Sequence, residues 1–282
     1  MTERDDVDHA GLTSNLHWMN GLGLSGYLLL GSTGEQVHLS EFERALVLEI
    51  GRRHIPTGLI LIAGTGQMST RATIEESRRA AEAGADVALV VTPSYYQKAM
   101  TANALAEHYR AVADASPIPV MLYSVPGITG ITIPPAVVAE LAGHPNIVGM
   151  KNSGSDPQVA AAYRAAAGDA PFVILAGSAT ASPGLLLTGL CDGVILAAAN
   201  VLPEATVALV QAAQQGDLSG VRHHGAALHH ASEQIGRFGI AGWKAGIAAR
   251  GLHGGPARPP LRNLTSEERH EIEAAVREWQ TA

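Results

Sequence analysis

The sequence predicts an α/β fold, and within that class a (β/α)8 barrel followed by a helical region. Two observations lead to this prediction. Short, wholly apolar runs recur along most of the chain, and amphipathic helical patterns fill the intervals between them. Apolar runs that do not alternate with polar residues are typical of parallel strands buried on both faces. Their regular separation by a helix is the pattern of a βα repeat.

Seven apolar runs predict the strands. They are Tyr27–Leu30, Leu59–Ala63, Val87–Val91, Val120–Tyr123, Ile147–Lys151, Phe172–Ala176 and Gly193–Ala197. A closed barrel of this type needs eight strands. Residues Val7–Leu22 predict a helix before the first run, so we expect the first barrel strand to be missing from this chain. A doubly wound open sheet, which accepts any number of strands, is the alternative.

Capping signals mark the helices between the strands. Ser40 stands where an N-cap is expected and Glu43 follows it by three residues, which is the pattern of a capping box. The helical pattern after residue 70 stops at Gly84, as is typical of a helix C-terminus. From about residue 214 the βα alternation ends and only helical patterns follow. We therefore expect a catalytic barrel over residues 1–215 and a helical region over residues 216–282.

Composition excludes several classes of protein. The 282 residues are 46% hydrophobic and 16% charged, with a net charge of −7, so a large core is expected and a basic surface for nucleic acid or anionic lipid is not. No apolar run approaches the roughly 20 residues of a membrane span, and the acidic start resembles neither a secretory signal nor a transit peptide. The one cysteine, Cys191, excludes an internal disulfide framework and is expected to be buried in the core. These features predict a cytoplasmic protein.

Two glycine-rich segments raise the question of anion binding. The segment Gly21–Gly26 matches the spacing of a dinucleotide-binding motif, but a helix precedes it and a strand follows it, the reverse of the required order. The segment Gly31–Glu35, "GSTGE", follows the first predicted strand, and neither it nor any other segment has the lysine of a phosphate-binding loop. We therefore expect its anion to be a carboxylate.

Lysine usage points to one candidate nucleophile. Of the 19 lysine and arginine residues only three are lysines: Lys98, Lys151 and Lys244. Lys151 ends an apolar strand, where burial would disfavour the ammonium form and leave an amine that can attack a carbonyl. The alternative is a lysine that extends to solvent from the strand end.

Hydroxyl-bearing side chains stand near the ends of other predicted strands. They are Ser32, Thr33, Tyr96 and Tyr123, and Gly177 occupies a comparable position. In a barrel all the carboxyl ends of the strands meet at one face, where active sites form. The combination predicts an amine nucleophile surrounded by groups that can relay protons.

Five motifs, taken in order, carry a resemblance to a known family. "GSTGE", "TPSYYQ", "YSVPGITG", "GMKNSG" and "LAGSA" resemble the dihydrodipicolinate synthase / N-acetylneuraminate lyase superfamily, and "HPNIVGMK", "RFGI" and "GGPARPPL" extend the match over nearly the whole chain. These proteins are class I pyruvate aldolases on (β/α)8 barrels. The resemblance implies a homotetramer built as a dimer of dimers, a small 2-keto acid substrate, and no cofactor beyond the lysine Schiff base.

The resemblance also implies a role for each matching residue. Lys151 would form the Schiff base, and Tyr123, coupled through Thr33, would move protons. Ser32 and Thr33 would bind the pyruvate carboxylate. Tyr96 would extend across a dimer interface to complete the proton relay of a neighbouring copy. Gly177 and Ile195 would line the pocket. Asn152 and Ser153 would face the distal end of the substrate.

The motifs are most similar to those of 4-hydroxy-2-oxoglutarate aldolases, which implies cleavage of that compound to pyruvate and glyoxylate. Dihydrodipicolinate synthases carry an arginine in the "YNVPGRTG" version of the tyrosine loop, to hold the carboxylate of an amino-aldehyde. This chain has Ile128 there, which argues against that activity. A sugar-acid (2-keto-3-deoxy) aldolase or dehydratase is the alternative within the same chemistry.

Two alternatives belong to other classes. The segment "HHGAALHH" contains His223, His224, His229 and His230, which raises the possibility of a metal-dependent enzyme. It lacks a carboxylate at metal-ligand spacing, so a solvated helix face is the preferred interpretation. A chain without its first barrel strand could also be a catalytically inactive binding or regulatory protein.

Overall fold

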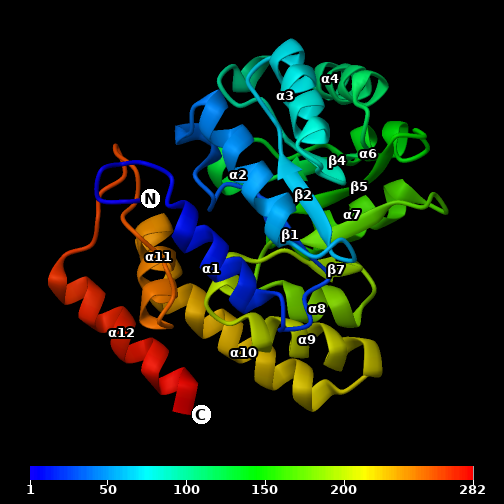
Figure 1. The fold of residues 1–282 in the computed structure, drawn as a ribbon. Coiled ribbons are helices and arrows are strands. Elements are labelled where there is room, and N and C mark those ends of the chain that lie inside the picture. The colour runs from blue at the N-terminus through cyan, green and yellow to red at the C-terminus, as the bar shows by residue number, and fades with distance from the viewer. Residues whose placement is uncertain (282) are drawn as a thin grey trace. The chain divides into compact units, whose positions relative to one another are not determined.

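The computed structural model describes residues 1–281 and contains one parallel sheet of seven strands, each paired with the next in the chain (Figure 1). The strands are β1 (Gly26–Leu29), β2 (Ile60–Gly64), β3 (Val87–Val91), β4 (Val120–Ser124), β5 (Ile147–Asn152), β6 (Val173–Ala176) and β7 (Gly193–Val194). This order and direction are those of successive βα units. The predicted α/β fold is confirmed, and the absence of the first barrel strand stays a prediction.

Helices fill the intervals between the strands and follow the last of them. Those before and between the strands are α1 (His9–Met19), η1 (Gln36–His38), α2 (Glu41–His54), α3 (Thr70–Glu82), η2 (Gln97–Ala99), α4 (Ala102–Ala115), α5 (Pro126–Thr129), α6 (Pro135–Leu141), α7 (Pro157–Ala167) and α8 (Ser182–Leu187). Those after β7 are η3 (Ala197–Asn200), α9 (Pro203–Gln215), α10 (Leu218–Gln234), η4 (Gly236–Phe238), α11 (Gly239–Ala249) and α12 (Ser266–Thr281). None of the helices in the described part of the chain is long and apolar enough to cross a membrane.

The chain divides into two compact units. The sheet unit comprises residues 26–29 and 60–195, and the helical unit comprises residues 1–25, 30–59 and 196–281. The helices after residue 216 therefore share a unit with α1, α2 and α9. The boundary between residues 215 and 216 stays a prediction.

The sheet unit contains two apolar clusters, one on each face of the sheet. The outer cluster joins strand residues such as Leu122 and Met150 to side chains of α4, α6 and α7, which lie along the outside of the sheet (Figure 1). The inner cluster consists of Ile62, Leu89, Met121, Tyr123 and Val125, with no helix residue in its buried core. Burial on both faces explains why the strands are apolar throughout.

The predicted helix caps are confirmed. Ser40 Oγ accepts a hydrogen bond from the Glu43 N–H at 3.2 Å, and the Glu43 carboxylate accepts one from the Ser40 N–H at 2.8 Å. Gly84 follows the end of α3 with a φ of +86°, a conformation that costs glycine little. Cys191 is buried as predicted, and its burial raises the pKa of the thiol to about 11.

Candidate active site

A β-bulge turns Lys151 toward the inner face of the sheet. Val120 pairs with Ile147, but the next residue, Met121, pairs with Gly149, so Val148 is left without a partner in the ladder. Regular alternation from Ile147, which packs in the outer cluster, would place Lys151 on the outer face as well. A bulge inserts one extra residue and reverses the faces that follow it.

The register after the bulge confirms the inward direction. Tyr123 pairs with Lys151, which pairs in turn with Leu175, and paired residues share a face of the sheet. Tyr123 and Leu175 both belong to the inner cluster, whereas Met150 packs in the outer one. Lys151 therefore lies beside Tyr123 on the inner face.

Gly149, which lies at the bulge, lets β5 approach β6 closely. A Cβ at this position would collide with the carbonyl oxygen of Val173 on the neighbouring strand and would lie 3.0 Å from its carbonyl carbon and nitrogen. All of these are backbone atoms, which cannot move without shifting β6. The sequence analysis did not single out Gly149, although a glycine inside a strand is a known sign of a bulge or a close approach.

We expect Gly149→Ala to lower the free energy of unfolding by about 1–3 kcal/mol, the usual cost of forcing extra atoms into a packed core. Because β5 must shift, the variant should also lose reactivity at Lys151. Denaturant unfolding and an amine-labelling rate measure the two effects. Gly143→Ala is the matched control, since a Cβ there meets no atom within 4 Å. Equal stability of the two variants would contradict the close approach of the Val173 backbone to Gly149.

Lys151 and Tyr123 form a buried pair. The side chain of Lys151 is only 7% exposed, and its Nζ lies 3.5 Å from the Tyr123 hydroxyl and 4.6 Å from the centre of the ring. Burial lowers the pKa of the Lys151 ammonium, and the charge and hydrogen bond of Tyr123 oppose this in part. The pair therefore favours a neutral amine next to a hydroxyl that can exchange protons with it.

Gly177 and Ser153 complete the surroundings of the lysine. The Gly177 N–H donates to the Asn152 carbonyl at 2.7 Å, and the Ser153 N–H donates to the Ser124 carbonyl at 2.8 Å, which fixes both loops at the carboxyl ends of the strands. A Cβ at Gly177 would collide with Ser153 Oγ and would lie 2.9 Å from Lys151 Cε. The absence of a side chain at 177 therefore leaves space around the amine.

The other predicted residues of the sheet unit lie at different depths. Ile195 donates its N–H to the Ala176 carbonyl at 2.9 Å and packs, partly buried, against the inner cluster. Tyr96 is 72% exposed, and its ring meets that of Tyr95 edge to face at 4.9 Å. Tyr96 is therefore not part of the buried group around Lys151, and its exposure is compatible with the predicted contribution to a neighbouring copy.

Ser32 and Thr33 belong to the helical unit, where they form a tight turn. The Gly34 N–H donates to the Gly31 carbonyl at 3.0 Å, and the Glu35 N–H donates to the Ser32 carbonyl at 3.2 Å. Leu30 and Glu35, on either side of the turn, adopt positive φ values of 58° and 56°. Both hydroxyl residues are half-buried, and their predicted role stays a prediction.

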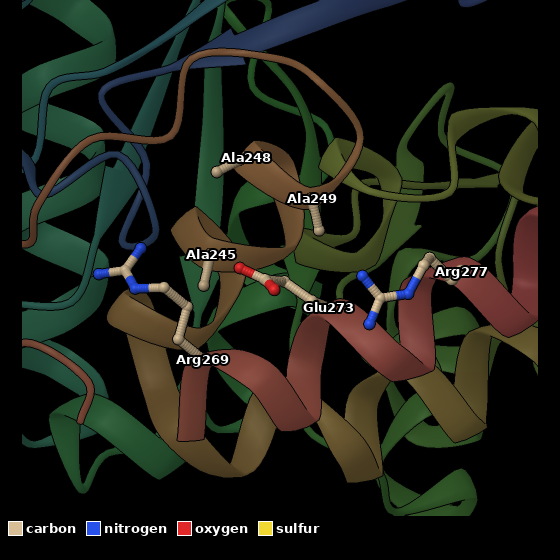
Figure 2. A pocket seen from close by; sticks show the side chains of 6 residues that line it. All are labelled: Ala245, Ala248, Ala249, Arg269, Glu273 and Arg277. Carbon is tan, nitrogen blue, oxygen red and sulfur yellow. The ribbon is translucent and has the colours of Figure 1, made fainter. Parts of the chain in front are cut away.

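Two other places lack the groups that such chemistry needs. A hollow of about 260 Å³ between α11 and α12 is lined by three alanines and by Arg269, Glu273 and Arg277 (Figure 2), and it offers no nucleophile. The histidines of α10 are mostly exposed, as predicted, and His223 meets His224 edge to face. Within residues 1–281 no group of three or more histidine, cysteine or acidic residues could hold a metal ion.

Comparison with known proteins identifies the family. The model of the dihydrodipicolinate synthetase family matches residues 1–279. The chain belongs to this family. A 4-hydroxy-tetrahydrodipicolinate synthase of Exiguobacterium sp. is 36% identical over 261 residues, which cover 91% of this chain and 87% of the relative. A probable mitochondrial 4-hydroxy-2-oxoglutarate aldolase of Emericella nidulans is 33% identical over 281 residues, covering 98% and 90%.

Solved structures of the family have the same fold. YagE, a prophage protein of E. coli K12 crystallised with pyruvate, superimposes with a TM-score of 0.92 at 26% identity and covers 100% of this chain and 96% of its own. The chloride-inhibited dihydrodipicolinate synthase of Acinetobacter baumannii, also with pyruvate, gives 0.90 at 30% identity, with coverage of 100% and 96%. Enzymes of the dihydrodipicolinate synthetase family are lyases that form a lysine Schiff base with pyruvate and use no metal or other cofactor. The predicted superfamily, enzyme class and Schiff-base chemistry are confirmed.

Proposed function

We propose that this chain cleaves 4-hydroxy-2-oxoglutarate to pyruvate and glyoxylate, with Lys151 as the nucleophile. The observation that carries the proposal is the buried position of the Lys151 amine beside the Tyr123 hydroxyl, where burial favours the neutral form of the amine. The likeness to the Emericella nidulans aldolase supports the choice of substrate. The exposed Ile128 stands in place of the arginine of the synthases and argues against the synthase activity, because an isoleucine cannot bind the carboxylate of an amino-aldehyde.

The proposed reaction starts at the keto carbon. The Lys151 amine adds to C2 of the substrate, and loss of water leaves an iminium that can accept an electron pair. Tyr123 then takes the proton of the C4 hydroxyl as the C3–C4 bond breaks, which releases glyoxylate and leaves an enamine. Protonation of C3 and addition of water to C2 return the free lysine and pyruvate.

The other residues have supporting roles in this proposal. Ser32 and Thr33 bind the carboxylate next to the keto group, and Thr33 links Tyr123 to the proton relay. Gly177 and Ile195 line the space around the substrate, and Ser153 contacts its distal end. Tyr96 completes the relay of a neighbouring copy, in a cytoplasmic dimer of dimers.

The test is reductive trapping followed by a substrate panel. The protein is incubated with pyruvate, reduced with borohydride and weighed; we expect a gain equal to pyruvic acid less one oxygen atom, located by peptide mapping on Lys151. The panel then compares 4-hydroxy-2-oxoglutarate with 2-keto-3-deoxy sugar acids, with release of glyoxylate as the readout. Several relatives are named as synthases, and an assay for the condensation of pyruvate with an amino-aldehyde tests whether this chain has that activity. No adduct on Lys151 would contradict the proposal.

The rate of trapping should depend on pH in a defined direction. Because burial lowers the pKa of Lys151 from its ordinary value of 10.5, the neutral amine becomes available at lower pH than for an exposed lysine. We expect the trapping rate to rise with a midpoint clearly below 10.5. The rate measured against pH under single-turnover conditions checks this. A midpoint at or above the ordinary value would contradict the buried pair.

A further inference from the structure

Glu35, the last residue of "GSTGE", is a buried acid for which the proposed reaction has no use. Its side chain is 2% exposed, and it lies directly after the turn that contains Ser32 and Thr33. Burying a carboxylate without partners is costly, so its contacts indicate what it does. Its ion pair and its carboxylate hydrogen bond both go to residues of the helical unit more than 200 positions later in the sequence, and the Met1 ammonium also interacts with its charge.

Lys244 of α11 is the ionic partner of Glu35. Lys244 Nζ lies 2.5 Å from Glu35 Oε2 and also donates a hydrogen bond to the Pro256 carbonyl at 2.6 Å. The other oxygen, Glu35 Oε1, accepts from the backbone N–H of Arg258 at 2.7 Å. Both carboxylate oxygens are thus engaged, which satisfies the condition under which a buried ion pair is stable.

The segment after α11, which contains Gly254 and Arg258, has a backbone path that brings it close to Lys244. A Cβ at Gly254 would collide with the Lys244 carbonyl oxygen, so only glycine lets the segment after α11 return to Lys244. The Arg258 guanidinium then donates to the His38 carbonyl at 3.0 Å and to the Glu43 carboxylate at 2.6 and 2.9 Å. Lys244 and Arg258 therefore hold the segment after Ser32 and Thr33 through contacts with residues 35, 38 and 43.

The turn itself needs such attachment. Glu35 holds a left-handed φ of 56°, which an ordinary side chain adopts only when its surroundings impose it. Its N–H closes the turn on the Ser32 carbonyl at 3.2 Å. A change in the position of the Glu35 carboxylate would therefore change the shape of the turn that presents the two hydroxyls.

We propose that Glu35 and Lys244 are a pair of positioning residues that hold the Ser32–Thr33 turn in its carboxylate-binding shape, and so set the preference of the enzyme for substrates with a carboxylate beside the keto group. The proposal rests on the role of Ser32 and Thr33 in the proposed function. Neither residue of the pair touches the reacting atoms. Loss of the pair should weaken the preference for substrates that carry the carboxylate, and the Lys151 amine should still react with the keto group.

The test compares pyruvate with pyruvamide, a neutral compound of nearly the same shape, in borohydride trapping of the full chain. The variants are Glu35→Gln, Lys244→Met and the double variant. Glu204→Gln is the matched control, because it removes a carboxylate that Arg250 contacts at 2.6 Å elsewhere in the helical unit. Each protein is also examined by thermal unfolding, so that a general loss of stability is seen separately.

We expect each of the three variants to lose about tenfold in the ratio of the pyruvate rate to the pyruvamide rate, the scale of one weakened hydrogen bond to a charged group. The loss should come from the pyruvate rate, with pyruvamide unchanged, and the control should keep the wild-type ratio. The double variant leaves no buried charge without a partner, so it should unfold at a higher temperature than either single variant yet keep the lowered ratio. If a single variant fails to fold, the rate ratio of the double variant still tests the proposal.

Two results would overturn the proposal in distinguishable ways. A wild-type protein that prefers pyruvate, together with variants that keep this preference or lose both rates equally, means that the pair stabilises the fold only. A wild-type protein that traps neither compound overturns the proposed function, and the positioning role with it.

Discussion

Replacement of Lys151 by methionine is expected to abolish both the pyruvate adduct and turnover, by at least about 10⁴-fold in kcat, since removal of a covalent nucleophile leaves only residual catalysis. Methionine has a similar length and can occupy the buried space next to Tyr123. The variant should therefore fold, and its inactivity can be assigned to the missing amine. Mass measurement after borohydride reduction and a coupled assay for glyoxylate are the two readouts.

The stability of Lys151→Met provides an independent check, with a definite sign. The pKa of Lys151 is lower in the folded protein than in the unfolded chain, so the folded state binds fewer protons between the two values and the lysine destabilises the fold at low pH. This cost is complete below the folded pKa and disappears as pH rises toward 10.5. We therefore expect the methionine variant to gain stability over the wild type at neutral pH and to lose that advantage at high pH.

Lys98→Met is the matched control for the adduct. Lys98 lies in η2 and is exposed, so its replacement should leave the adduct on Lys151. An adduct that survives in Lys151→Met, or that disappears in Lys98→Met, would show that another amine reacts with pyruvate.

The strands and the candidate nucleophile were predictable because they depend on local features of the sequence. Uninterrupted apolar runs identify buried parallel strands, and seven of them place their carboxyl ends on one edge. Lys151 was recognisable as a rare lysine at the end of such a run. The capping box at Ser40 and the glycine after α3 are equally local, and the structure confirms both.

The features that the sequence could not reveal depend on pairing between distant segments. Alternation along β5 alone would place Lys151 on the outer face, and only the ladder with β4 reveals the bulge that turns it inward. The contact of Glu35 with Lys244 joins residues more than 200 positions apart, so neither sequence pattern nor spacing points to it. Lys244 did carry one signal, as another of the three lysines in a chain that otherwise uses arginine.

Removal of the Tyr123 hydroxyl is the second change with a large expected effect. Tyr123→Phe keeps the ring, which lies 4.6 Å from Lys151 Nζ, and removes the oxygen at 3.5 Å from the same atom. If this hydroxyl accepts the C4 proton during cleavage, kcat should fall about 10²- to 10⁴-fold, the usual contribution of a positioned general base. The pyruvate adduct should still form, because Lys151 is retained.

The pH dependence of trapping separates this role from a purely structural one. The hydrogen bond and charge of Tyr123 raise the pKa of Lys151, against the larger effect of burial. With the hydroxyl gone only burial remains, so the midpoint of the trapping rate in Tyr123→Phe should move to lower pH than in the wild type. An unchanged midpoint would mean that the two side chains do not interact in solution.

Tyr163→Phe is the matched control for the loss of a buried tyrosine hydroxyl. The Tyr163 hydroxyl donates to the Ile133 carbonyl at 2.7 Å, and its ring packs in the outer cluster, on the face of the sheet opposite to Lys151. Its removal should cost about 1–3 kcal/mol of stability, because a buried carbonyl loses its partner, while kcat and the trapping midpoint stay at their wild-type values. A comparable loss of kcat in both variants would indicate that activity follows stability, and the proton-transfer role of Tyr123 would then be wrong.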